Sequence, residues 1–348
     1  MTPHRHPWRA FRRTAISAVL LGVAALNGAA ALAQDKPKTI TIGSTAPGHV
    51  KFILGEEKKS FSDAFAADGI KVELVTFDGG GSGAITALAT GSLDIAYTGF
   101  APALRAASTG ADVRLIGLST FVPYLDVAII VKKNSAITTI ADLKGKKVAY
   151  LTGTVRQAAL AKALDLAKLN LKDIDGLNLN FDSSAPALIR GDVDAIVEST
   201  DTAQRLVETG KARVLIDGRE HPEWSAPYAI SVNGQFLRKY PDLVRRFLAV
   251  DLSLSRWADT HYDDTIRIYV RRTKASEAAL RETYKQGRFY LDPAITPRAI
   301  KALRAEAALM KTMGLLKQSI DFDKWIDPSL VNEVLREHPE PQGDAQVR

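Results

Sequence analysis

The feature that most constrains the fold is a pattern that occurs once near residue 91 and again near residue 191. In each copy an apolar helical run ends at a glycine, an acidic residue follows, and a short apolar strand comes next, as in Gly91–Gly99 and Gly191–Val197. A glycine just past the last turn can take the positive φ that ends a helix. The repetition predicts two α/β lobes built on similar plans. We expect the functional site in the cleft between them, at the carboxyl ends of the strands.

Strands and helices alternate along most of the chain, which predicts mostly parallel sheets flanked by helices. The continuous apolar run at residues 127–131 is typical of a strand that is buried on both faces. We expect a discontinuous lobe 1, made of residues 34–131 and 226–348, and a lobe 2 made of residues 132–225. The two crossings between the lobes, near residues 121–133 and 218–232, would form a hinge.

The first 33 residues predict a cleavable secretory signal peptide. A positively charged start without an acidic residue precedes an apolar segment at residues 16–31, and Ala31-Leu32-Ala33 fits a cleavage site. Four arginines lie in this segment, so its removal lowers the formal net charge from +7 to 7 − 4 = +3. Because no basic stripe interleaved with aromatic residues remains, nucleic acid is not an expected partner. We expect a periplasmic protein.

Two glycine-containing turns are candidate anion sites. Gly79-x-Gly81-x-x-Ala84 follows a predicted strand and opens a helix, but it lacks the acidic residue at the end of the next strand that dinucleotide binding requires. An anion site at the helix N-terminus and a plain turn with Ser82 as N-cap both stay open. Thr152–Arg156 repeats the design in lobe 2. Its arginine suits a sulfonate, carboxylate or phosphate, or else lies on a solvated helix face.

Further polar residues follow the predicted strands. Thr98-Gly99, Ser119-Thr120 and Ser199-Thr200-Asp201 each stand at a strand's carboxyl end, so their hydroxyl and amide groups would converge on the cleft. Asp94 and Asp194 stand at strand starts instead. We interpret them as turn and cap residues.

Catalytic and metal-binding patterns are missing from the sequence. The chain has no cysteine, which excludes thiol catalysis and cysteine metal sites. His49, His221, His261 and His338 are isolated, without a zinc-binding spacing. We therefore expect no enzymatic activity, no metal and no cofactor.

These motifs resemble the periplasmic solute-binding proteins of the nitrate, sulfonate and taurine ABC importers. The resemblance rests on residues 77–107, on Ala141–Ala149 and on Gly191–Ala195, and it weakens in the C-terminal helices. It implies a two-lobed fold of the type II periplasmic class that closes by hinge motion around a small anionic or zwitterionic solute. It also implies an ABC permease and ATPase at the inner membrane as partners. We expect a monomer.

The resemblance also implies which residues bind the ligand. By position these are Ser44, Thr45, Ser82, Thr98, Gly99, Thr120, Gly153, Thr154 and Ser199. The chemistry of the side chains adds Arg156 for an anionic group and Asp201 for an amine, and a zwitterion such as taurine would use both.

The chain departs from the family at Gly81-Ser82-Gly83 and at Ser199–Asp201, where small hydroxyl residues replace larger polar or aromatic ones. A different ligand is therefore allowed. An exported enzyme, a thiamine-pyrimidine-related binding protein on the same fold, and a periplasmic scaffold without a transported ligand stay open as alternatives.

Overall fold

The computed structural model describes residues 1, 36–45, 49–77, 81–122, 125–284, 287–289 and 291–339. Apart from Met1, the predicted signal peptide lies outside the described residues. Residues 78–80 of the glycine-rich turn and 123–124 of the first predicted crossing lie outside them too. The chain divides into two units, Met1–Pro37 and Lys38–Arg348. Both sheets and their helices belong to Lys38–Arg348. No described helix combines the length and the apolar character that crossing a membrane requires.

The first sheet has five strands in the spatial order β2-β1-β3-β10-β4. Four of them point the same way, and β10 runs antiparallel between β3 and β4. The register places Ile42 beside Ile95 and Thr98 beside Ala229. Its strands are β1 (Thr39–Ser44), β2 (Lys71–Thr76), β3 (Ile95–Thr98), β4 (Val113–Thr120) and β10 (Tyr228–Asn233).

The second sheet follows the same plan, in the order β7-β6-β8-β5-β9. Here β5 is the antiparallel strand, between β8 and β9. Both sheets are thus mostly parallel, as predicted, and Ile129 and Ile130 of β5 are buried as expected of a central strand. Its strands are β5 (Ala128–Lys132), β6 (Lys147–Tyr150), β7 (Asp175–Asn178), β8 (Ala195–Glu198) and β9 (Ala212–Asp217).

The repeated sequence pattern occupies equivalent places in the two sheets. Asp94 accepts a hydrogen bond from the backbone N–H of Thr41 at 2.8 Å, and Asp194 accepts one from Lys147 at 2.9 Å. Each carboxylate therefore fixes the start of its strand against the neighbouring strand, so both residues are structural, as interpreted from the sequence. Gly91 and Gly191 end the preceding helices with φ of 78° and 95°, a conformation that favours glycine.

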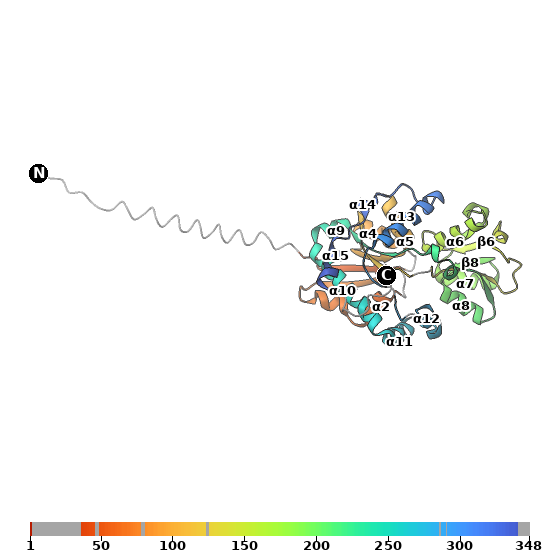
Figure 1. The fold of residues 1–348 in the computed structure, drawn as a ribbon, viewed down its shortest axis with the longest axis horizontal. Coiled ribbons are helices and arrows are strands. Elements are labelled where there is room, and N and C mark those ends of the chain that lie inside the picture. Colours follow the sequence, from red (N-terminus) through yellow and green to blue (C-terminus); the bar gives the residue numbers. More distant parts are fainter. Residues whose placement is uncertain are drawn as a thin grey trace. The chain divides into compact units, whose positions relative to one another are not determined.

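Helices flank both sheets, and Figure 1 shows those of the second sheet gathered around β6 and β8. They are α6 (Val155–Leu166), α7 (Phe181–Arg190) and α8 (Thr200–Glu208). The helices along the first half of the chain are α2 (Val50–Glu57), α3 (Ser60–Ala66), α4 (Gly81–Thr90) and α5 (Phe100–Ser108). The chain breaks between α2 and α3, where Lys59 has a φ of 54°.

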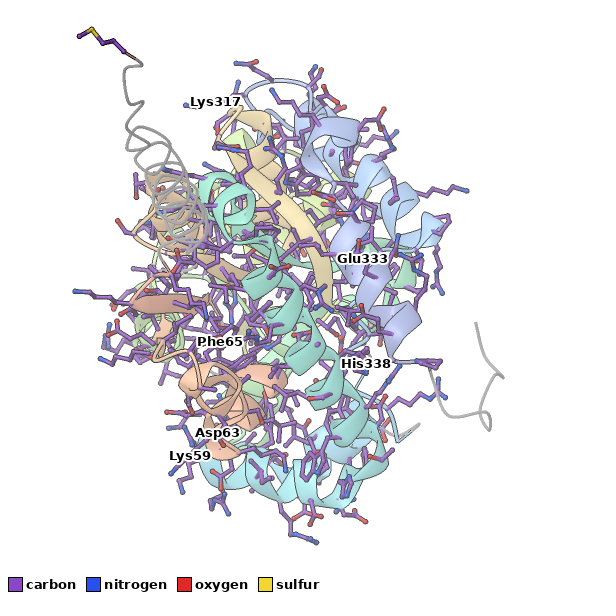
Figure 2. The ribbon with its side chains drawn as sticks, turned by 90° about the vertical axis from the view of Figure 1, so that its left-hand side faces the viewer. Lys59, Asp63, Phe65, Lys317, Glu333 and His338 are labelled. Atoms are coloured by element: carbon purple, nitrogen blue, oxygen red, sulfur yellow. The ribbon has the colours of Figure 1, made fainter. Side chains whose placement is uncertain are left out.

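The C-terminal part of the chain is helical, as predicted, and packs on the first sheet. Its helices are α9 (Gly234–Lys239), α10 (Pro241–Thr260), α11 (Tyr262–Thr273), α12 (Glu277–Thr283), α13 (Pro297–Thr312), α14 (Phe322–Trp325) and α15 (Ser329–Glu337). α10 contacts α2, α3 and α15, and α14 and α15 contact β4. Figure 2 shows α10 running past Phe65 of α3 on one side and Glu333 of α15 on the other.

The chain passes between the two sheets twice, from β4 to β5 and from β9 to β10. The two crossings lie side by side, because Ser225 Oγ donates to the carbonyl of Val122 and the Gly218 N–H donates to that of Val127 at 2.8 Å. A third link joins α6 to α13. Lys162 Nζ lies 2.6 Å from Glu306 Oε2, both side chains are buried, and Lys162 also donates to the carbonyl of Trp224 at 3.0 Å.

Candidate functional site

A cavity of about 720 Å³ is lined by residues from both sheets and from the two crossings. Among the residues predicted from the sequence, its lining includes Ser44, Thr45, Thr98, Gly99, Thr120, Thr154, Arg156, Ser199 and Asp201. Most of them are the last residue of a strand or the residue directly after it. The cavity therefore lies where the strand ends of both sheets face each other, the place at which α/β folds bind ligands.

Ser82 and Gly153 are not among the lining residues. Ser82 lies inside α4 rather than at its N-cap, and its Oγ lies against the backbone of Gly153, which has a φ of 80°. The two residues contact each other instead of facing the cavity. The resemblance placed both residues at the ligand by position alone, and position alone could not reveal this contact between them.

The N-terminus of α5 is a donor-rich point on the cavity wall. Its N-cap, Gly99, supplies no side-chain cap. The N–H groups of Phe100 and Ala101 in its first turn have no acceptor within the helix, and Pro102, the third residue, has no N–H. The preceding residue, Thr98, is 2% exposed, and its Oγ1 has no hydrogen-bond partner in the part of the chain that the structure describes. A buried hydroxyl without a partner costs free energy. It is a candidate for a ligand contact.

Arg156 reaches the same region from the second sheet, because Gly99 packs against the side chain of Val155 at the start of α6. The guanidinium is already held: its Nη2 lies 2.8 Å from Glu198 Oε2, and it stacks on the Phe181 ring at 3.9 Å from the centroid. The solvated helix face considered from the sequence is therefore wrong. Its Nε is buried and finds no acceptor among the described residues, so one donor is left for a ligand.

Glu198 was missed by the sequence reasoning. It is 3% exposed and also accepts a hydrogen bond from Ser184 Oγ at 2.5 Å. Burial raises the pKa of its carboxyl, while the charge of Arg156 acts in the opposite direction. The strand was predicted, but an acid at its last position gave no signal of pairing with an arginine that is distant in sequence.

Asp201 does not offer a free carboxylate. It pairs with Arg205 one turn further along α8. Ser199, also predicted, accepts from the Thr202 N–H at 3.3 Å and so caps α8. In the same way Thr154 caps α6 by accepting from the Arg156 N–H at 3.2 Å.

Asp126, a cavity residue that sequence reasoning missed, does offer a free oxygen. Its Oδ1 accepts from Thr200 Oγ1 and from the Thr200 N–H at the start of α8. Among the residues that the structure describes, its Oδ2 has no donor and its charge has no cationic partner. Tyr228 and Tyr269 line the same cavity, and the pKa of both phenols is raised by burial and by the charge of Asp126.

A buried polar cluster adjoins the cavity, whose lining includes His49 and Tyr97. Lys51 Nζ is 2.6 Å from Asp251 Oδ2, and Tyr97 OH donates to Asp251 Oδ1 at 2.7 Å. The His49 ring packs against the Tyr97 ring in a tilted arrangement, with ring centroids 4.8 Å apart and an interplanar angle of 36°. Both His49 ring nitrogens are buried and have no hydrogen-bond partner among the residues that the structure describes, and burial lowers the His49 pKa to about 3. No residue pattern in the sequence pointed to this cluster.

Comparisons with known proteins agree with this architecture. The chain is 30% identical over 288 residues to a Bacillus subtilis (strain 168) protein that is named for the binding of aliphatic sulfonates, covering 82% of this chain and 85% of the relative. The alkanesulfonate-binding protein of Xanthomonas axonopodis pv. citri, bound to MOPS, matches with a TM-score of 0.74 at 22% identity, over 84% of this chain and 99% of that one.

A desulfurization enzyme has the same fold. It matches with a TM-score of 0.67 at 20% identity, over 87% of this chain and all of that one. At this identity the likeness shows the fold alone, and the fold carries both binding proteins and an enzyme. The family model described as NMT1/THI5 like matches residues 46–255, more than half of the sequence. The protein belongs to the NMT1/THI5 like family.

Proposed function

We propose that the protein is the extracytoplasmic solute-binding component of an ABC importer and that it holds the sulfonate group of a small solute in the cavity. The observation that carries the proposal is the buried, unpartnered Thr98 Oγ1 beside the uncapped N-terminus of α5. The name of the Bacillus subtilis relative supports sulfonate as the anionic group.

The donors suit such a group. A sulfonate has three oxygen atoms, and the cavity offers the Thr98 hydroxyl, the first N–H groups of α5, and Arg156 Nε. A helix N-terminus favours a negative charge through its exposed N–H groups and its dipole. α5 follows β3 of the first sheet, and Arg156 lies on α6, which follows β6 of the second sheet. A bound sulfonate would therefore contact both parts of the chain.

Closure follows from these contacts. We propose that residues 34–131 with 226–348, and residues 132–225, move as two lobes about the crossings, and that the solute stabilises the closed form by bonding to both. A permease at the inner membrane would recognise that form. In this proposal residues 1–33 direct the chain to the periplasm, and it acts as a monomer.

Isothermal titration of the purified protein tests the sulfonate site. Alkanesulfonates should bind, and alkanecarboxylates of equal chain length should bind more weakly, because they offer one oxygen fewer. Thr98→Val should lower sulfonate affinity by about tenfold or more, since a hydrogen bond to a charged group contributes about 1.5–3 kcal/mol. It should not lower the melting temperature, because the hydroxyl has no partner in the free protein.

Thr86→Val, an exposed position on α4, is the matched control. Equal binding of sulfonates by wild type and Thr98→Val would contradict the site. Recovery of the sulfonate unchanged after prolonged incubation would separate binding from the enzymatic alternative. Among the described residues no carboxylate bonds to the His49 ring, so we expect full recovery.

A further inference from the structure

We propose that one end of the second sheet binds the surface of an anionic phospholipid bilayer. This surface, the lysine edge, consists of residues 132–147, 164–175, 190–194 and 207–213. The cavity is lined where β6 and β8 end and where β5 begins, whereas the lysine edge comprises the other ends of the same strands. A bilayer bound there would leave the cavity free for a solute.

The four segments form one continuous surface. Residues 132–147 lead out of β5 and into β6, and the other three segments contain the starts of β7, β8 and β9. Hydrogen bonds from backbone N–H to backbone carbonyl join the segments, from Asp175 to Lys146 at 2.9 Å, from Asp194 to Lys147 at 2.8 Å and from Lys133 to Lys211 at 3.0 Å.

The lysine edge carries the positive excess of the chain. It contains eight lysines, two arginines and seven acidic residues, so its formal net charge is 10 − 7 = +3. The chain without its first 33 residues has the same net charge of +3. Seven of the eight lysines are exposed, all except Lys132. The lysines that pair with acids in the described part of the chain, Lys51, Lys71 and Lys162, all lie elsewhere.

Most acidic residues of the lysine edge are engaged with groups other than lysine ammonium groups. Asp142, Asp173 and Asp194 accept hydrogen bonds from backbone N–H groups. Asp192 pairs with Arg190, and Glu208 accepts from a glutamine side chain on α8. These contacts hold the turns in place and leave the lysines available to an external partner.

The corresponding end of the first sheet shows a contrast. There Lys71 pairs with Glu73, and Arg114 and Arg238 both pair with Asp112. The two sheets follow one plan, so that plan does not by itself require unpaired lysines at this end.

Two apolar residues are exposed on the same surface. Leu166 is 57% exposed and Val207 is 43% exposed, and apart from Met1 they are the exposed large apolar residues of the described chain. They stand at or next to the C-terminal ends of α6 and α8. Apolar side chains among lysines suit the boundary between headgroups and acyl chains, because binding there combines apolar burial with attraction to anionic lipids.

The composition favours a bilayer over an acidic protein as the partner. Protein interfaces are enriched in aromatic residues and arginine and depleted in lysine. The four segments contain eight lysines and no aromatic residue. A lysine cluster is attracted by the surface potential of anionic lipids without fixed pairing. The proposal goes beyond the proposed function and takes from it only a location beside the inner membrane.

Vesicle flotation tests the lysine edge. Protein without residues 1–33 is used, because that segment lies outside the unit Lys38–Arg348 and its apolar run would itself enter a bilayer. The protein should float with vesicles of equal parts phosphatidylcholine and phosphatidylglycerol and should not float with phosphatidylcholine alone. At about 1 M salt, where the Debye length is about 3 Å, the binding should weaken at least about tenfold.

A variant that combines Lys144→Gln, Lys146→Gln and Lys147→Gln should bind the anionic vesicles at least about tenfold more weakly, because each lysine beside the bilayer contributes to binding. If it does not fold, the combination of Lys133→Gln, Lys172→Gln and Lys211→Gln should give the same loss.

The matched control combines Lys301→Gln, Lys317→Gln and Lys324→Gln, which removes the same charge from exposed positions outside the lysine edge. It should bind the vesicles within about twofold of wild type, because charges far from the bilayer are screened.

Equal wild-type binding to anionic and neutral vesicles, or equal binding by the edge variant and the control, would overturn the proposal. Binding to soluble polyglutamate that is as tight as binding to the vesicles would indicate an acidic protein partner and would overturn it too. Flotation is measured without a solute, so its outcome does not depend on the sulfonate titration, and each proposal can fail alone.

Discussion

His49 brings a titratable ring into an environment that favours its neutral form. Its ring nitrogens are buried beside Tyr97 and have no partners. Burial, assisted by the charge of Lys51, lowers the His49 pKa from 6.5 to about 3. An imidazole that stays neutral across the physiological range can donate one hydrogen bond and accept another.

The shift of this pKa makes stability depend on pH. The folded protein keeps His49 neutral, whereas the unfolded chain takes up a proton below pH 6.5. The associated stability is therefore present above pH 6.5 and is lost as the pH falls from 6.5 toward 3, by at most about 1.4 kcal/mol per pH unit.

Urea unfolding of wild type and His49→Gln between pH 7.5 and 4.5 measures this effect. The difference in unfolding free energy should be constant above pH 6.5 and should shrink or reverse below it. If the unfolding free energies of the two proteins changed in parallel over the whole pH range, the lowered pKa of His49 would be contradicted.

At the scale of elements, α2 and α10 are joined by an ion pair that water does not reach. Lys51 and Asp251 are both fully buried. Burial lowers the pKa of Lys51 and raises that of Asp251, and their mutual attraction opposes both shifts. The Tyr97 hydroxyl supplies the second bond to the carboxylate and so ties β3 to the same pair.

Lys51→Met should destabilise the protein by about 3–5 kcal/mol, because it leaves the Asp251 carboxylate buried without a cation. The double variant Lys51→Met, Asp251→Leu should recover a large part of this loss, since no charge remains buried. Chemical denaturation of wild type, Lys51→Met and the double variant measures these changes in the free energy of unfolding. A double variant less stable than Lys51→Met would show that the pair itself, rather than the uncompensated charge, dominates.

The elements were largely predictable because their signals are local. Strand β3 and strand β8 follow from a repeated glycine, acid and apolar run, and β5 follows from an unbroken apolar run. The break between α2 and α3 was not predictable, because a lysine at φ 54° carries no sequence mark of that conformation. A local sequence pattern predicts a helix or strand well where a glycine's backbone conformation or the burial of an apolar run determines the structure.

The sequence could predict which strand ends contribute to the candidate site, but not which of its charged side chains pair with each other. Sequence placed Thr98, Thr120 and Ser199 at strand ends, and these residues line the cavity. It could not show that Glu198 holds Arg156, or that Asp201 pairs with Arg205 while Asp126 has no cationic partner among the described residues. Such pairings depend on side chains that meet only after the two sheets have folded, so spacing along the chain does not reveal them.

At the scale of the whole molecule, the link between α6 and α13 is a buried contact between helices that belong to different lobes in our proposal. Lys162 touches Glu306 and the carbonyl of Trp224, and its ammonium lies 5.3 Å from the Phe100 ring centroid. Burial raises the pKa of Glu306, and the charge of Lys162 opposes that shift. The contact is placed to hold the two parts of the chain together in the absence of a solute.

Lys162→Met should loosen that arrangement. We expect small-angle X-ray scattering to give a larger radius of gyration for the ligand-free variant than for ligand-free wild type, and equal values for both at saturating solute. Lys168→Met, just beyond the end of α6, is the control with the same change of charge. Identical scattering of all the ligand-free proteins would contradict a role for the pair in holding the lobes together.

The contact between Ser82 and Gly153 makes the protein suitable as an optical reporter. It joins α4 to the turn before α6 outside the cavity lining, so a dye attached there would not meet the solute. Because the chain contains no cysteine, Ser82→Cys would provide a single attachment point without further changes. Closing and opening of the lobes would alter the surroundings of the dye, and the concentration of a colourless solute could be followed as fluorescence.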